Sequence, residues 1–516
     1  MTRVGALFLY KLRFFFGPAL RGTFGPLAYI GLILLFLPSG YGIGITLAAG
    51  IKGASAAQAI STLSAPLSAV LALGLLYSVF SGVTAHVSEF DFFMTADVRP
   101  REYLLSDLLF QFVSLFGAGG LAAVVAAFGM VSFVGRPLLA AVPLLVTLFA
   151  FALLVLMVIQ IVTVLNVRYP KGHVRAAALV LFVLSLLPAA TLAYPAFPLH
   201  FQDLPLPMTA FGTLGYDALM GVPVSLEAAT VAAVSFLAVA GAWVALSDTY
   251  IFHGIHPSLS AGFGQIDMAA RMAQQRRMTA GFGKFTTGLT VRTDRGNDTS
   301  YMARYHLLRI VRDGSIVFIG LFAVISLLPI QLGNTEPSTQ QAPISLLATQ
   351  MLTFLVAILA LNWSYYERDN LWIVVAAAKS PAPYFRGLMM SFTGVGLVVA
   401  FAFVAFYLGT YAGPIPVSEL AVPIAAAVSA ALVATACLTR LKVQPAAFSF
   451  SMLAILASAV IAGYFGGFVA SGLLSAVELA LGLGPIVQVL VLAAYCAALA
   501  AFGLWWVSRL AAGFRL

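Results

Sequence analysis

Two short charged segments carry residue types that are suited to binding another protein. Each has two acidic residues separated by one other residue, then an apolar or aromatic run, a basic residue, a proline and a tyrosine. We assign contact roles to Glu89, Asp91, Phe93 and Arg99 in the segment 88–107, and to Glu367, Asp369, Trp372 and Lys379 in the segment 367–386. Aromatic side chains fill pockets of a partner, and charges set its orientation. The alternative for either segment alone is an ordinary solvated loop, and the repetition argues against that alternative for the pair.

The sequence carries no complete motif for catalysis, nucleotide binding or metal binding. The nearest approach to a phosphate-binding loop is Gly-Phe-Gly-Lys-Phe at 281–285, where Phe285 replaces the required hydroxyl residue and Met278 the first glycine. The His-Gly-Ile-His sequence at 253–256 has ligand-like spacing, but no cysteine or carboxylate cluster completes a metal site. We therefore predict that the chain is not an enzyme, has no ATPase site of its own and needs no cofactor.

The composition is that of a membrane protein. Of the 516 residues, 61% are hydrophobic and only 9% are charged, whereas soluble proteins carry about 25% charged residues. The net charge of +9 comes from basic residues in short loops between apolar runs, which is a topology signal and not a nucleic-acid footprint. Cys437 and Cys496 lie inside apolar runs, which predicts buried free thiols.

Apolar runs of about 20 residues predict an all-α polytopic protein with about twelve transmembrane helices. The six expected spans of the first half are 26–48, 62–86, 108–132, 138–166, 175–196 and 226–248. Those of the second half are 314–333, 344–365, 387–411, 416–438, 446–469 and 485–508. This divides the chain into a first transmembrane half at 1–248, a polar cytoplasmic linker at 249–303 and a second transmembrane half at 304–516.

The distribution of basic residues predicts the orientation. With the N-terminus in the cytoplasm and each span crossing once, Lys52 and Arg136 are the only basic residues placed outside. Since cytoplasmic loops carry an excess of Lys and Arg, both termini and the linker are predicted to be cytoplasmic. The predicted location is the plasma membrane.

The two halves have the same layout, which indicates an internal repeat. Each opens with a basic, aromatic or amphipathic stretch, at 3–21 and 301–313. In the second stretch Tyr301, Tyr305 and Leu308 share one helical face and Arg309 and Arg312 lie on another, which predicts a helix in the membrane interface with basic side chains reaching lipid headgroups. A plain flank of a membrane span is the alternative for this second stretch. Each half also has an outer stretch broken by glycine or proline, at 197–225 and 467–484, which is too interrupted to span but can dip in where protein buries it.

This layout resembles the permease subunits of ABC exporters of the second bacterial class, in their long form that fuses both halves in one chain. The stretch at 366–384 is most similar to the acidic-aromatic-to-proline segment of that family, whereas the first copy departs from it with Thr95-Ala96-Asp97 before Val98. The resemblance implies an exporter powered by separate cytoplasmic ATPase subunits, two copies of which dock on coupling helices formed by the two charged segments. It leaves the substrate open.

Two other classes of membrane protein compete with the exporter hypothesis. A secondary carrier or lipid-linked-sugar flippase predicts ionisable side chains at membrane depth. The expected spans contain almost none, and polar residues such as Gln160 and Gln488 are assigned to interhelical hydrogen bonds. The other class, a non-transporting membrane scaffold, predicts no coupling to ATP hydrolysis.

Overall fold

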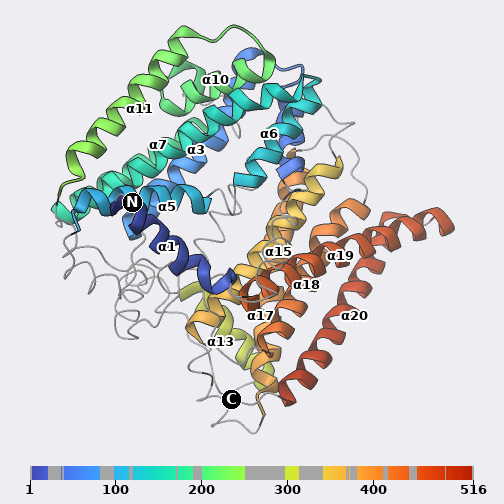
Figure 1. The fold of residues 1–516 in the computed structure, drawn as a ribbon. Helices are drawn as coiled ribbons and strands as arrows, with labels where there is room; N and C mark the ends of the chain where they lie inside the picture. Colours follow the sequence, from blue (N-terminus) through green and yellow to red (C-terminus); the bar gives the residue numbers. More distant parts are fainter. Residues whose placement is uncertain are drawn as a thin grey trace. The chain divides into compact units, whose positions relative to one another are not determined.

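The computed structural model describes residues 3–20, 37, 40–81, 98–115, 120–169, 172–189, 200–249, 297–312, 341–367, 371, 380–410, 417–440, 450–482 and 484–513. Within these residues every regular element is a helix, which confirms the all-α class (Figure 1). The described residues up to 249 belong to one compact unit, and those from 297 onward to a second. The predicted linker at 249–303 falls mostly outside the described residues.

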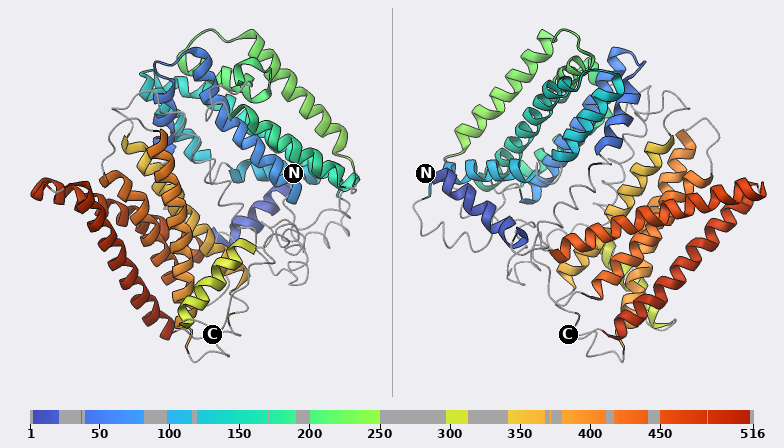
Figure 2. Two further views of the ribbon diagram at one scale, coloured as in Figure 1. Left: turned by 180° about the vertical axis from the view of Figure 1, so that it is seen from behind. Right: turned by 45° about the vertical axis from the view of Figure 1, so that its right-hand side comes forward.

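The first unit is built around three long helices. Its α-helices are α1 (Arg3–Leu20), α3 (Ala56–Ser81), α5 (Pro100–Leu115), α6 (Leu121–Val134), α7 (Ala141–Arg168), α8 (His173–Leu186), α10 (Pro207–Met220) and α11 (Leu226–Leu246). Short 3-10 turns are η2 (Leu138–Ala140), η3 (Leu187–Ala189) and η4 (Phe201–Asp203), and a further helical stretch covers Gly40–Ile51. Helix α3 packs against α7, α8 and α10, and α11 lies along α7 and α10 (Figures 1 and 2).

The second unit surrounds one central helix. Its elements are α13 (Asp298–Arg312), α15 (Gln341–Tyr366), α17 (Ala382–Thr410), α18 (Val417–Leu438), α19 (Phe450–Leu481) and α20 (Pro485–Ala512). Helix α18 packs against α15, α17, α19 and α20, and half of its residues are buried alanine, serine or valine. Helix α13 lies against α17 (Figure 2).

Seven helices in the described part of the chain are long and apolar enough to cross a membrane. They are Ala56–Leu76, Leu138–Arg168, Leu226–Leu246, Ala382–Ala405, Val417–Leu438, Ile455–Ala480 and Pro485–Ala512. Four shorter apolar helices accompany them: Gly40–Ile51, Leu121–Val134, His173–Leu186 and Ala348–Trp363. These helices indicate a membrane-embedded protein, and the total of about twelve spans stays a prediction.

Five expected spans are not among the seven. Two of them, 26–48 and 344–365, overlap the shorter helices Gly40–Ile51 and Ala348–Trp363. The run at 108–132 is shared between α5, which ends at Leu115, and α6, which begins at Leu121. The run at 175–196 forms α8, which ends after 14 residues and continues as the 3-10 turn η3. The run at 314–333 lies outside the described residues.

The stretch at 467–484 was expected to be too interrupted for a continuous span, and most of it is instead part of the continuous helix α19. A Cβ atom on Gly463 would meet Thr353 of α15, and Cβ atoms on Gly466 and Gly467 would meet Ser429 and Val422 of α18. Glycine here allows close approach of neighbouring helices, as small residues four apart do in membrane proteins. The helix ends only at Gly482, whose φ of 58° suits a residue without a side chain.

The other interrupted stretch, 197–225, contains the buried helix α10. Met208, Phe211 and Leu219 of this helix are almost fully buried, and it packs between α3, α7 and α11. A Cβ atom on Gly212 would meet Ser64 of α3, so this glycine also permits close helix packing. This agrees with the prediction that the stretch is covered by protein, because a helix of 14 residues is too short to span.

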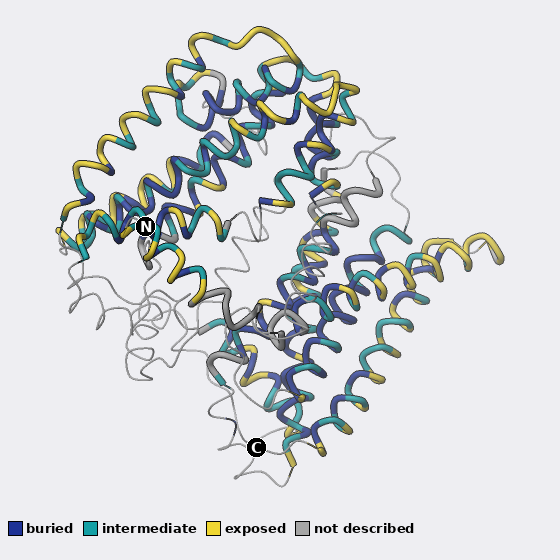
Figure 3. The backbone as a smooth tube through the Cα atoms, viewed as in Figure 1, coloured by how far each residue is buried: buried dark blue, intermediate teal, exposed yellow. Residues whose placement is uncertain are grey.

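Each unit presents an apolar helix face that protein does not cover (Figure 3). On α11 the exposed side chains include Leu226, Val234 and Leu237, and on α20 they include Ile486 and Leu490. Contiguous exposed apolar surface of this extent is unfavourable in water and favourable against lipid tails. The exposed faces therefore support the membrane assignment made from composition.

Candidate functional site

The structure describes two of the eight predicted contact residues. Glu89, Asp91, Phe93, Asp369, Trp372 and Lys379 lie outside the described residues, so their roles stay predictions. Arg99 and Glu367 are described. Glu367 is a member of a polar cluster in the second unit, and Arg99 stands four residues before Tyr103, a member of a polar cluster in the first unit. Each cluster joins the first described helix of its unit to neighbouring helices.

Arg99 is an exposed residue immediately before α5. The helix begins with Pro100, whose fixed φ and missing N–H suit the first helical position. The backbone N–H of Arg99 donates to the Glu102 carboxylate at 3.2 Å, which satisfies a donor at the helix start. The geometry leaves the Arg99 side chain at the surface, where the contact hypothesis requires it.

Glu367 is held by residues of its own unit. Its carboxylate lies 3.0 Å from the Arg309 guanidinium of α13, and it accepts hydrogen bonds from the hydroxyls of Tyr384 at 2.5 Å and Tyr305 at 3.3 Å. The side chains of Glu367 and Arg309 are only 14% and 16% exposed. Arg309, one of the basic residues of the stretch 301–313, is therefore paired with a carboxylate of its own unit, and the interface role of that stretch stays a prediction.

A neutral histidine, His306, lies beside the residues that hold Glu367. The His306 ring lies edge-on to the Tyr384 ring, with 4.6 Å between centroids. Burial, aided by the nearby Arg309 charge, lowers the pKa of His306 to about 3. The indole N–H of Trp363 donates to the Tyr384 hydroxyl at 2.9 Å. We call Tyr305, His306, Arg309, Trp363, Glu367 and Tyr384 the Glu367 cluster.

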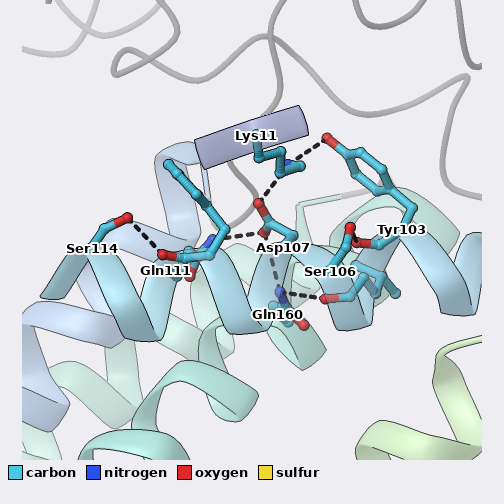
Figure 4. Close-up of polar contacts among 9 residues, drawn as sticks. Lys11, Tyr103, Ser106, Asp107, Gln111, Ser114 and Gln160 are labelled. Atoms are coloured by element: carbon cyan, nitrogen blue, oxygen red, sulfur yellow. Dashed lines mark hydrogen bonds and ion pairs between the residues drawn. The ribbon is translucent and has the colours of Figure 1, made fainter. Parts of the chain in front are cut away.

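The first unit contains a fully buried ion pair (Figure 4). Lys11 of α1 and Asp107 of α5 are 2.8 Å apart, and both side chains are 0% exposed. The Lys11 ammonium also donates to the Tyr103 hydroxyl at 3.2 Å and lies 4.4 Å from the centre of that ring. Gln111 donates to the second Asp107 oxygen at 2.8 Å. Both charges are thus hydrogen-bonded, as burial demands.

The contacts of Asp107 continue into two long helices of the unit. The side-chain amide of Gln160 on α7 donates to Asp107 at 3.1 Å and to the Leu104 carbonyl at 3.2 Å. Its amide oxygen accepts from the Trp243 indole of α11 at 2.7 Å. We call Lys11, Tyr103, Asp107, Gln111, Gln160 and Trp243 the Asp107 cluster, which joins α1, α5, α7 and α11.

The two clusters share one local arrangement. Tyr103 stands three residues after Pro100, and Tyr384 stands three residues after Pro381, each within its own charged segment. Each tyrosine contacts the residue that follows a tyrosine on an amphipathic helix, Lys11 in one unit and His306 in the other. Neither contact was predicted. The Pro-x-x-Tyr sequence and the Tyr-Lys or Tyr-His sequence occur in both halves, and this repetition was a signal from which the two contacts could have been predicted.

No group of three or more His, Cys, Asp or Glu side chains in the described residues is placed to hold a metal ion. The chain matches no family model, no curated protein and no solved structure. Function must therefore be argued from the clusters and from the apolar helices around them.

Proposed function

We propose that this chain is the membrane permease of an ATP-driven exporter, powered by separate cytoplasmic ATPase subunits. Its two units would be related halves of one transport pathway, embedded in the plasma membrane with both termini in the cytoplasm. The observation that carries the proposal is the shared arrangement in which an amphipathic helix binds the tyrosine that follows a charged segment: Lys11 with Tyr103, and His306 with Tyr384.

This arrangement gives a partner a direct mechanical path into each unit. The charged segments lead into the first turns of α5 and α17, and these helices hold α1 and α13. An ATPase subunit that displaces either segment would therefore move the first turn of α5 or α17, and with it the helix α1 or α13 that packs there. Two segments imply two ATPase copies, one for each unit.

A secondary carrier or flippase is the second candidate, and the Lys11–Asp107 pair is the observation in its favour. Buried ionisable pairs are typical of ion-coupled transport, and this pair was not anticipated from the sequence. Within the described residues, neither α1 nor α5 is among the seven helices that are long and apolar enough to cross a membrane. The pair therefore suits a joint between helices better than a site on a transmembrane ion path.

The test is capture of the tagged chain from its native membrane in mild detergent, followed by mass spectrometry and an ATP hydrolysis assay. We expect an ABC ATPase to co-purify, and orthovanadate to abolish the hydrolysis. An ATPase variant without its phosphate-loop lysine should still co-purify but not hydrolyse, which controls for contaminating enzymes. Absence of any ABC ATPase after reversible crosslinking in intact membranes would refute the proposal.

A further inference from the structure

We infer that Asp107 is a positioning residue that makes α1 a fixed part of the first unit, so that α1, α5, α7 and α11 move together. The inference rests on the proposed function for its transport meaning. Its structural basis is a continuous series of short polar contacts: Lys11 to Asp107, Asp107 to Gln160, and Gln160 to Trp243. Each contact joins two different helices, and all of the side chains are buried.

The carboxylate of Asp107 is the point at which the contacts meet. One oxygen accepts from Lys11, while the other accepts from Gln111 and Gln160. Because a carboxylate accepts in a few fixed directions, these donors define one position of α1 and one of α7 relative to α5. Sliding any of the three helices would separate buried charged or polar atoms, and no water is available there to replace the lost partner.

Packing alone does not explain this cluster. Apolar side chains of similar volume hold helices together without the desolvation cost of two buried charges. The second unit illustrates the apolar solution, since Leu388 stands four residues after Tyr384 and is buried, as Asp107 stands four residues after Tyr103. The ion pair adds specificity of helix position, because polar contacts allow a single register between two helices whereas apolar contacts allow several.

α1 is thereby assigned a different role from a helix that only rests on lipid. A lipid-surface helix can tilt or detach without disturbing the helices below it. α1 cannot leave α5 without separating the buried charges of Lys11 and Asp107, which are 2.8 Å apart. Motion that enters at the start of α5 therefore carries α1 along and reaches α7 and α11 through Gln160.

The test compares four full-length variants in lipid nanodiscs: Lys11→Met, Asp107→Leu, the double variant, and Gln160→Leu. Amide hydrogen exchange of α1 is measured first, since it needs no ATPase. Each single ion-pair variant should raise α1 exchange by about 100-fold, because it leaves one buried charge unpaired. The double variant should restore most of the protection, and Gln160→Leu should leave α1 exchange at the parent value.

The second measurement is ATP hydrolysis by the complex with the captured ATPase. The double variant and Gln160→Leu should both lose coupled hydrolysis although α1 stays docked, because each breaks the path from α1 or α5 to α7. The matched control is Arg3→Gln, which removes the partly exposed 4.0 Å pair between Arg3 and Glu102 of the same two helices and should change neither measurement.

Two results would overturn the inference. One is unchanged α1 exchange in Lys11→Met and Asp107→Leu, which would make the ion pair irrelevant to docking. The other is parental coupling in both the double variant and Gln160→Leu, which would reduce the cluster to packing. If the single variants fail to accumulate, Gln160→Leu still decides the coupling question, because it keeps the ion pair. Expected exchange data with no associated ATPase would instead count against the proposed function alone.

Discussion

Acidification should loosen α13 from α17, because His306 is buried in its neutral form. Its pKa is lowered from 6.5 to about 3 by burial and by Arg309. Stability from the neutral imidazole is therefore complete above about pH 6.5 and falls by about 1.4 kcal/mol for each pH unit below it. At about pH 5 the loss is about 2 kcal/mol, or a factor of about 30 in the docking equilibrium.

The groups that face His306 determine how the protein responds when this histidine is protonated. Arg309 on the same helix opposes a second positive charge, while Tyr384 of α17 offers an aromatic ring in place of a counter-ion. Glu367 at the end of α15 is already paired with Arg309. Protonated His306 thus has no carboxylate of its own among the described residues, and release of α13 is the available response.

The assay is hydrogen exchange of α13 in nanodiscs at about pH 7.5 and about pH 5, corrected for the pH dependence of intrinsic exchange. Parent protein should lose about 30-fold protection, whereas His306→Leu should lose little. Glu367→Gln is the control for titration of that carboxylate: it should lower protection at both pH values but keep the pH dependence. An identical pH response in parent and His306→Leu would refute the reasoning.

Three further predictions concern the membrane arrangement and the partner. Arg276→Cys should react with an impermeant thiol reagent only in inverted vesicles and Asp203→Cys only in intact cells, because basic segments stay inside; the opposite pattern would disprove the topology. The purified chain alone should hydrolyse no ATP, since its glycine-rich segment lacks a phosphate cradle; turnover that survives removal of contaminating ATPases would contradict this. Phe93→Ala and Trp372→Ala should each weaken ATPase binding by about 2 kcal/mol, measured by titration of the ATPase, if each fills a pocket; parental affinity and coupling in the double variant would mark the charged segments as ordinary loops.

The long apolar helices could be read from the sequence, and the lengths of the interrupted ones could not. Expected spans at 138–166, 226–248 and 416–438 correspond closely to α7, α11 and α18. Glycine misled the prediction in α19, where Gly467 allows contact with Val422 of α18 and does not break the helix. Helix-breaking tendency is a local property, whereas the value of a missing side chain depends on a neighbour that the local sequence does not name.

The polar clusters were harder to predict for a related reason. Lys11 and Asp107 are 96 residues apart, and Asp107 stands directly before the apolar run at 108–132, where it reads as a charge at the edge of a span. Gln160 was correctly assigned to interhelical hydrogen bonding, and its bonds to Asp107 and Trp243 confirm that assignment. Its partners depend on how α5, α7 and α11 pack, which residue spacing does not determine.

The two clusters hold their amphipathic helices by different physical means, and the difference has a consequence for order of release. Lys11 and Asp107 are fully buried, so salt screens their attraction little. Glu367 and Arg309 retain some exposure, and the His306 imidazole beside them is buried in its neutral form. High salt therefore weakens the attachment of α13 more than that of α1, and acid weakens the attachment of α13 through His306. If ATPase subunits act with equal force on both units, we expect α13 of the second unit to detach before α1 of the first.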